Sequence, residues 1–156
     1  MLTKDGIKVI EYNARFGDPE AMNVLSILKS DFLSICISLV EGKLEKEEVL
    51  FDELATVCKY VVPLGYPNNP KKGFEVFCDQ NDSSLFLASV MFKNKKLIAC
   101  GSRTAAVVGK NRDIQKAEAF AEQGVSNISG KLFHRKDIGT KDLIDLRVKR
   151  MKELLS

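Results

Sequence analysis

The sequence predicts an α+β fold in which a small, mostly antiparallel sheet carries two packed helices. Three observations predict it. Short apolar segments follow one another between residues 55 and 108, two apolar faces with helical spacing come after them, and a strand and a helical stripe come before them. The chain has 156 residues, 45% hydrophobic and 29% charged. That balance suits one ordinary domain, or a small domain with a piece of another.

The chain opens with the pattern of a strand. Residues alternate from Ile7 to Asn13, which would place Glu11 and Asn13 on one face. Directly before them, Lys4-Asp5-Gly6 predicts a tight hairpin turn. Only residues 1–3 are left to form the partner strand. We therefore expect the chain to begin too late, inside a longer structural unit.

A helical stripe follows the Gly17-Asp18-Pro19 break. Its apolar residues recur at steps of three and four, and we expect them to be buried: Met22, Leu25, Leu28, Phe32, Ile35 and Leu39. Ser30-Asp31 marks a point at which the stripe can divide into two helices, and Gly42 fits a helix C-cap. The acidic segment Leu44–Glu53 is expected to be an exposed connection between two domains, residues 1–43 and 54–156.

The second domain begins with predicted strands and ends with predicted helices. The strand segments are separated by turn-rich pieces, and they are Thr56–Val62, Phe74–Cys78, Leu85–Phe92, Lys96–Cys100 and Thr104–Val108. One helical face is formed by Ile114, Ala117, Ala121, Val125 and Ile128, and a second, after the N-cap Thr140, by Ile144, Val148, Met151 and Leu155. We expect both helices to pack on the sheet.

Composition argues against several functional classes. No run approaches the roughly 20 apolar residues of a membrane helix, and the N-terminus carries no export pattern, so we expect a cytoplasmic protein. The four cysteines form no close pairs and are expected to be buried free thiols. A single histidine, His134, excludes a His-rich metal site. The basic run Arg147–Lys152 is best interpreted as a solvated helix end, with a nucleic-acid-binding module as the alternative, although no aromatic stacking platform accompanies it.

The segment Glu11-Tyr12-Asn13-Ala14-Arg15 carries the side chains best suited to bind a cation and phosphate. In a strand, residues i and i+2 are same-face neighbours roughly 6.6 Å apart, so Glu11 and Asn13 can grip one cation. A carboxylate and an amide oxygen suit Mg²⁺, and a neighbouring arginine suits phosphate. The spacing alone is also compatible with a solvated polar edge strand.

Four motifs, in their order along the chain, resemble those of a known protein family. The segment Val9–Glu20 resembles the strand-and-turn signature of the glycinamide ribonucleotide synthetase (phosphoribosylamine–glycine ligase) family, which belongs to the ATP-grasp ligases. The other motifs follow in the family's order: Gly65-Tyr66-Pro67 with Lys72-Gly73, Gly101-Ser102-Arg103, and Phe133–Gly139. The resemblance covers essentially the whole chain, and its first segment is the most specific.

The resemblance implies a reaction and roles in it. ATP would phosphorylate the carboxylate of glycine, and the amine of 5-phosphoribosylamine would then displace phosphate. Glu11 and Asn13 would hold Mg²⁺ or Mn²⁺ against the ATP phosphates, and Arg15 would neutralise the transferring phosphoryl group. Asp18 would either position substrate or cap the following helix.

The resemblance also implies which domain each part of the chain belongs to and which further residues could contact substrate. Arg103, Arg135 and Lys136 could each meet a substrate phosphate, or could instead be solvated or paired with a local carboxylate such as Asp137. Residues 1–43 would be the C-terminal end of an ATP-grasp domain, and residues 54–156 the C-terminal α+β domain of the ligase.

Departures from the family pattern limit the prediction. Ala21-Met22 stands where many members have Thr-Gln, and Gly101-Ser102-Arg103 where Gly-Gly-Arg is usual. The family's N-terminal domain and most of its ATP site have no counterpart in this sequence. We therefore expect the C-terminal part of the ligase, inactive alone, with its missing parts in cis or on a separate chain. The alternative is a split-gene subunit or a non-catalytic interaction module.

Overall fold

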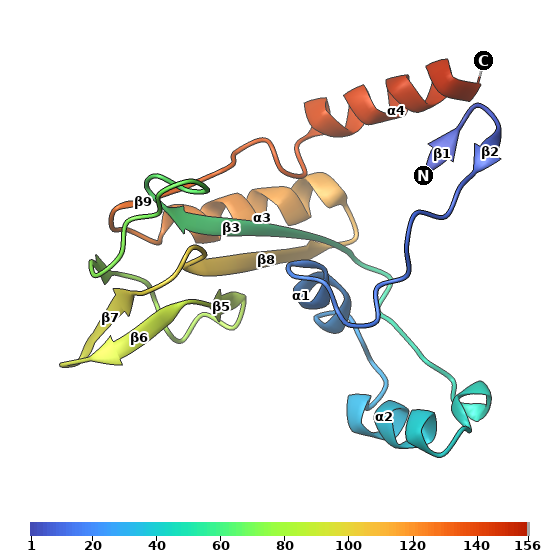
Figure 1. The fold of residues 1–156 in the computed structure, drawn as a ribbon, viewed down its shortest axis with the longest axis horizontal. Coiled ribbons are helices and arrows are strands. Elements are labelled where there is room, and N and C mark those ends of the chain that lie inside the picture. The colour runs from blue at the N-terminus through green and yellow to red at the C-terminus, as the bar shows by residue number, and fades with distance from the viewer. Residues whose placement is uncertain (156) are drawn as a thin grey trace.

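A four-stranded antiparallel sheet forms the centre of the computed structural model, which describes residues 1–155 (Figure 1). Its strands run in the order β5-β8-β3-β9, and they are β5 Leu85–Leu87, β8 Ala105–Asn111, β3 Ala55–Pro63 and β9 Leu132–His134. The long pair β3 and β8 is aligned from Ala55 opposite Asn111 to Val61 opposite Ala105. The predicted α+β class is confirmed, whereas strand β9 is an addition to the predicted elements.

A second, three-stranded antiparallel sheet replaces part of the single sheet that we expected. Its order is β4-β7-β6, with β4 Glu75–Val76, β7 Lys96–Ala99 and β6 Val90–Lys93. The predicted strand Leu85–Phe92 breaks at Ala88 and Ser89, whose backbone amides bond to the carbonyls of Thr104 and Arg103. The chain therefore passes from one sheet to the other at this point.

Helix α3, Ile114–Ser126, covers one face of the central sheet. Asp113 caps it by accepting from the amides of Gln115 and Lys116. The predicted apolar face of the helix is buried against both sheets through Ala117, Ala121, Val125 and the following Ile128, whereas Ile114, its first predicted member, is 40% exposed. The core of the molecule therefore lies between α3 and the two sheets.

The other face of the central sheet carries the short helix α1, Glu20–Leu25. Its Met22 packs against the side chains of Cys58, Ala106 and Val108. These residues alternate with those that face α3, because successive side chains on a strand point to opposite sides. Strand β3 is thus covered on both faces, and α1 holds the N-terminal segment close to it.

The N-terminal segment forms the predicted hairpin but not the predicted strand. Strands β1, Leu2–Thr3, and β2, Gly6–Ile7, are joined by a tight turn in which Gly6 has φ +94. Beyond Ile7, residues 8–13 have no regular structure, so the expected strand to Asn13 is wrong. Lys8 still exchanges backbone hydrogen bonds with Met1 at the end of the hairpin, but among the described residues no strand pairs with residues 9–13, and an alternating pattern needs such a partner to become a strand.

The predicted helical stripe divides at Ser30-Asp31, as expected. Asp31 caps helix α2, Phe32–Val40, by accepting from the Ser34 amide, and Gly42 ends it with φ +67. The 3₁₀ helix η1, Leu44–Lys46, follows. The expectation that the stripe is buried is wrong, because Phe32 is 42% and Leu39 61% exposed. Instead, α2 projects from the main body (Figure 1).

Helix α4, Lys141–Leu155, follows Thr140, whose hydroxyl accepts from the Leu143 amide at 3.5 Å. It does not pack on the sheet as predicted. Across its whole length no residue is buried, and Val148 and Leu155 are 47% and 67% exposed. Figure 1 shows it extending away from the sheet toward the β1–β2 hairpin.

The expectations about the cysteines and about membrane helices can be compared with the structure. In residues 1–155 all four cysteines are free, but only Cys58 is buried, and Cys100 is exposed. Burial, with a smaller effect of nearby carboxylates, raises the pKa of Cys58 to about 12. Within the same residues, no helix is long and apolar enough to cross a membrane.

Candidate functional site

Asp18 links the N-terminal segment to the central sheet. Its carboxylate accepts from the Tyr60 hydroxyl and from Arg103 Nη1, both at 2.8 Å, and its carbonyl accepts from the same nitrogen at 3.2 Å. Arg103 also lies over the Tyr60 ring, 5.4 Å from its centroid. Burial and then the Asp18 carboxylate raise the pKa of Tyr60, which therefore remains a neutral hydrogen-bond donor.

This arrangement argues against one of the two roles left open for Asp18, the helix cap. The N-cap of α1 is Pro19, which makes no side-chain capping bond, so the helix-cap interpretation is wrong. The carboxylate of Asp18 faces Tyr60 and Arg103 instead. Because Arg103 lies in the turn before β8, the ion pair closes a loop of 85 residues.

A polar cavity of about 650 Å³ opens beside this ion pair. It brings together four of the residues singled out in the sequence, and its lining is Asn13, Arg15, Phe16, Gly17, Asp18, Glu20 and Arg103. Arg15 donates one bond from Nη1 to the Phe16 carbonyl at 2.8 Å, which leaves most of its N–H groups available. The lining also carries the carboxylates of Glu20 and of Asp18, and Asp18 is paired with Arg103, so Arg15 is the guanidinium best placed to bind an anionic group such as a phosphate.

A second cavity, of about 440 Å³, lies on the other side of Arg103. It is largely apolar, and its lining is Pro19, Cys58, Tyr60, Val62, Tyr66, Pro67, Arg103, Phe133, Arg135 and Ile138. Two of the predicted motifs, Gly65-Tyr66-Pro67 and the segment around Arg135, therefore meet here. Arg103 lines both cavities and so joins them into one candidate site.

Glu11 and Asn13, the predicted metal ligands, are both exposed. Their side chains make no hydrogen bond or ion pair within residues 1–155. Asn13 lines the polar cavity, whereas Glu11 lies outside its lining. Within the described residues no three His, Cys, Asp or Glu side chains gather to hold a metal ion. Because residues 8–13 form no strand, the same-face spacing that predicted a shared cation is absent here, and only Asn13 faces the cavity.

Arg135 and Lys136 differ in position. Arg135 makes a two-pronged ion pair with Asp137, at 3.0 Å from Nε and 2.5 Å from Nη2, as the alternative interpretation anticipated. Hydrogen bonds from Arg135 hold the pKa of Asp137 below its usual range. Lys136 instead borders a different hollow with Asp137, Thr140 and Leu143. The structure thus groups Arg135, but not Lys136, with Arg103.

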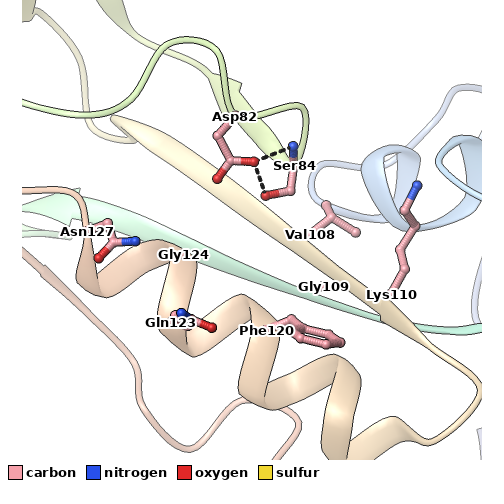
Figure 2. A pocket seen from close by; sticks show the side chains of 9 residues that line it. All are labelled: Asp82, Ser84, Val108, Gly109, Lys110, Phe120, Gln123, Gly124 and Asn127. Atoms are coloured by element: carbon pink, nitrogen blue, oxygen red, sulfur yellow. Dashed lines mark hydrogen bonds between the residues drawn. The ribbon is translucent and has the colours of Figure 1, made fainter.

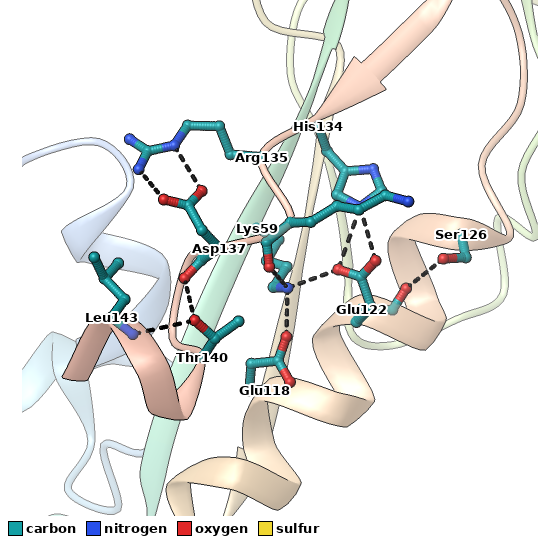
Figure 3. Close-up of polar contacts among 10 residues, drawn as sticks. Lys59, Glu118, Glu122, Ser126, His134, Arg135, Asp137, Thr140 and Leu143 are labelled. Atoms are coloured by element: carbon teal, nitrogen blue, oxygen red, sulfur yellow. Dashed lines mark hydrogen bonds and ion pairs between the residues drawn. The ribbon is translucent and has the colours of Figure 1, made fainter. Parts of the chain in front are cut away.

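Sequence reasoning missed a buried polar cluster behind this site (Figure 3). The ammonium of Lys59 is fully buried and paired with Glu118 and Glu122 of α3, and Glu122 also bonds to His134. Two signals were available in the sequence. Lys59 shares a strand face with Val57 and Val61, where an apolar residue is the norm, and the two glutamates stand one helical turn apart.

A separate hollow of about 400 Å³ lies at the opposite edge of the sheet (Figure 2). It is open to solvent between α3, β8 and the loop before β5. Within it the Asp82 carboxylate accepts from the amide and hydroxyl of Ser84, which lowers the pKa of Asp82. The residues predicted for the site do not line it.

Comparisons with known proteins agree closely with one another. Residues 56–141 match the family model described as "Phosphoribosylglycinamide synthetase, C domain". Phosphoribosylamine–glycine ligase of Methanococcus maripaludis strain S2 is 52% identical over 159 residues, covering 99% of this chain and 36% of that protein. The ligase of Methanocaldococcus jannaschii is 51% identical over the same length, with the same coverage.

A solved structure is similar as well. The crystal structure of phosphoribosylamine–glycine ligase from Thermotoga maritima gives a TM-score of 0.76 with 26% sequence identity, covering 88% of this chain and 35% of that chain. This chain therefore spans about a third of the length of the curated relatives that it matches.

Proposed function

Because this chain belongs to the phosphoribosylamine–glycine ligase family, also called phosphoribosylglycinamide synthetase, we propose that it supplies the C-terminal part of such a ligase in purine biosynthesis. The proposed reaction consumes ATP. The glycine carboxylate takes the γ-phosphoryl group to form an acyl phosphate and ADP. The amine of 5-phosphoribosylamine then attacks the acyl carbon, a C–N bond forms, and inorganic phosphate leaves.

The observation that carries this proposal is the ion pair between Asp18 and Arg103. It brings Arg103 to the polar cavity that Asn13 and Arg15 also line, although Arg103 lies far from both in the sequence. Phosphoryl transfer depends mainly on positioned positive charge, since the three equatorial oxygens carry the developing negative charge. Arg15, whose side chain bonds to a backbone carbonyl and to no carboxylate in the described residues, and the unpaired amide of Asn13 on the same cavity wall fit that requirement.

The metal ligands in this proposal are Glu11 and Asn13, which would hold Mg²⁺ or Mn²⁺. Both side chains are exposed and unpaired within residues 1–155, and their oxygens are hard donors of the kind these ions prefer. A bound cation would neutralise phosphate oxygens of ATP, the co-substrate. Arg15 lines the polar cavity together with Asn13 and carries the catalytic role of compensating charge on the transferring group.

The proposed substrate contacts are made by residues next to the strands of the central sheet. Arg103 lines both cavities, so its guanidinium can bind a substrate phosphate or carboxylate while Asp18 orients it. Arg135 offers a second guanidinium on the apolar cavity. Lys136 borders a different hollow and is the weakest of the substrate-binding assignments.

The same proposal includes the assignment of the two domains and bears on the alternative functions. Residues 1–43 are assigned to the end of an ATP-grasp domain and residues 54–156 to the C-terminal α+β domain, with the N-terminal and ATP-binding parts in cis or on a separate chain. The comparisons do not favour a nucleic-acid-binding module or a non-catalytic interaction module, because the relatives reported above are named as ligases.

The test is a fusion in which this chain replaces the matching third of the M. maripaludis ligase. ADP formation that depends on both glycine and phosphoribosylamine is measured. Glu11→Ala is expected to abolish it, and Glu45→Ala, an equally exposed carboxylate on η1, is the matched control. Full activity of the Glu11→Ala fusion would overturn the assignment of the metal site.

A further inference from the structure

Lys59 is a buried cation in the middle of the central strand β3. The residue is 1% exposed, and its Nζ donates to three acceptors: Glu118 Oε1 at 2.5 Å, Glu122 Oε2 at 2.6 Å and the Lys136 carbonyl at 3.0 Å. An ammonium group has three N–H donors, so all of them are used. Figure 3 shows these bonds converging from α3 and from the segment after β9.

The bond to Lys136 reaches the segment that carries Arg135. On β9, His134 and Phe133 point to opposite faces, because side chains alternate along a strand. His134 Nε2 contacts Glu122 at 3.0 Å on the α3 side, whereas Phe133 and Arg135 line the apolar cavity on the other side. Contacts made at His134 and Lys136 on the α3 side of the sheet therefore hold the backbone on both sides of Arg135, whose guanidinium is itself paired with Asp137.

The hydrogen bonds of Lys59 are strengthened by the charges of the groups that make them. Although burial raises the pKa of Glu122, hydrogen bonds from Lys59 and His134 outweigh it and lower that pKa. Charge-assisted bonds of this kind are stronger than neutral ones. Without the ammonium, two carboxylates would face each other, and the Lys136 carbonyl would lose its donor.

We propose that Lys59 is a positioning residue of the ligase site, which directs Arg135 into the cavity it shares with Arg103 by holding the Lys136 carbonyl and, through Glu122, His134. Its role in the reaction rests on the proposed function, which assigns Arg135 to substrate. The link between Lys59 and Arg135 stands on the geometry of the cluster.

The experiment follows the side-chain Nε–H signals of arginine in ¹⁵N NMR spectra of this chain. Lys59→Met removes the ammonium and keeps an unbranched stem. It is expected to shift and broaden the Arg135 signal and to leave Arg103 unchanged, because Asp18 holds Arg103 independently. Lys141→Met, which breaks the exposed pair with Asp145 on α4, is the matched control and should leave both signals unchanged.

Ribose 5-phosphate serves as a stable probe of the substrate phosphate site. Lys59→Met is expected to weaken its binding about tenfold, the equivalent of one charged hydrogen bond. A folded Lys59→Met chain with an unchanged Arg135 signal would overturn the proposal. If that variant does not fold, Glu122→Gln decides the matter, because it must shift the Arg135 signal in the same direction.

The link between Lys59 and Arg135 and the assignment of Arg135 to substrate can be refuted separately. If the Arg135 signal moves but ribose 5-phosphate binds neither the wild-type chain nor the variant, the assignment of Arg135 to substrate is overturned while the positional link remains. If the probe binds with equal affinity to both, Lys59 has no positioning role for substrate, and the proposed function is untouched.

Discussion

Gly109 is the position at which a single added methyl group should do most damage to the scaffold behind the site. It lies on β8 directly under α3. A Cβ built there would stand 1.9 Å from the Ala117 carbonyl oxygen and 2.7 Å from the Ala121 nitrogen, where ordinary contact begins near 3.4 Å. Both neighbours are backbone atoms of a helix, so neither can rotate away.

The expected cost of Gly109→Ala follows from that geometry. Overpacking a core typically costs about 1–3 kcal/mol, and a clash with helix backbone belongs at the upper end, about 3 kcal/mol. For a chain of this size, that lowers the melting temperature by about 6–12 °C. Thermal unfolding followed by circular dichroism measures it directly.

Gly124→Ala is a matched control on the same interface. There the added Cβ meets side-chain atoms of Val107, the nearest at 2.6 Å, and a valine side chain can adjust. Alanine also has a higher helix propensity than glycine by about 1 kcal/mol, which offsets part of the cost. A Gly109→Ala chain that melts with the wild type, or above Gly124→Ala, would refute this reasoning.

Three further outcomes are expected. Asp18→Asn should lower the pKa of Tyr60, because burial and then the Asp18 carboxylate raise it; titration of tyrosinate absorbance measures the change, and an unmoved titration curve would contradict the bond. Glu122 has its pKa lowered in the folded chain, so the stability it contributes is present above its ordinary value of 4.5 and is lost as pH falls through the lowered value. In urea unfolding, the free energy of unfolding of Glu122→Gln should therefore fall less steeply with decreasing pH than that of the wild type. The same pH dependence in both proteins would contradict this expectation. Gly42→Ala should cost about 1 kcal/mol, because φ at this position is +67, whereas Gly42→Asn should cost less. Hydrogen exchange at the end of α2 would detect the fraying, and equal exchange in the two variants would speak against the left-handed cap.

Local signals predicted the regular elements well where the partner of each element lies within the described chain. The alternation around β3 and β8, the division of the stripe at Ser30-Asp31 and the N-cap Thr140 were correct, because each depends on neighbouring residues. The strand to Asn13 and the packed face of α4 were wrong. Periodicity states which face an element can bury, and it does not state what covers that face.

The candidate site shows the same limit. The motifs identified Asp18 and Arg103 as separate candidates, but their contact joins positions 85 residues apart, and no local rule pairs them. Lys59 was overlooked because a lysine in a strand is usually solvated. Its burial follows only once Glu118 and Glu122 are seen to lie opposite it.

The tyrosines around the two cavities give this chain an optical label of its own. It contains no tryptophan and three tyrosines. Tyr12 stands between Glu11 and Asn13, while Tyr60 and Tyr66 line the apolar cavity. Emission excited at wavelengths that phenylalanine does not absorb therefore comes from these three tyrosines, two of which line the apolar cavity. Titrations with nucleotides, metal ions or phosphate esters can be read from that emission without introducing a dye.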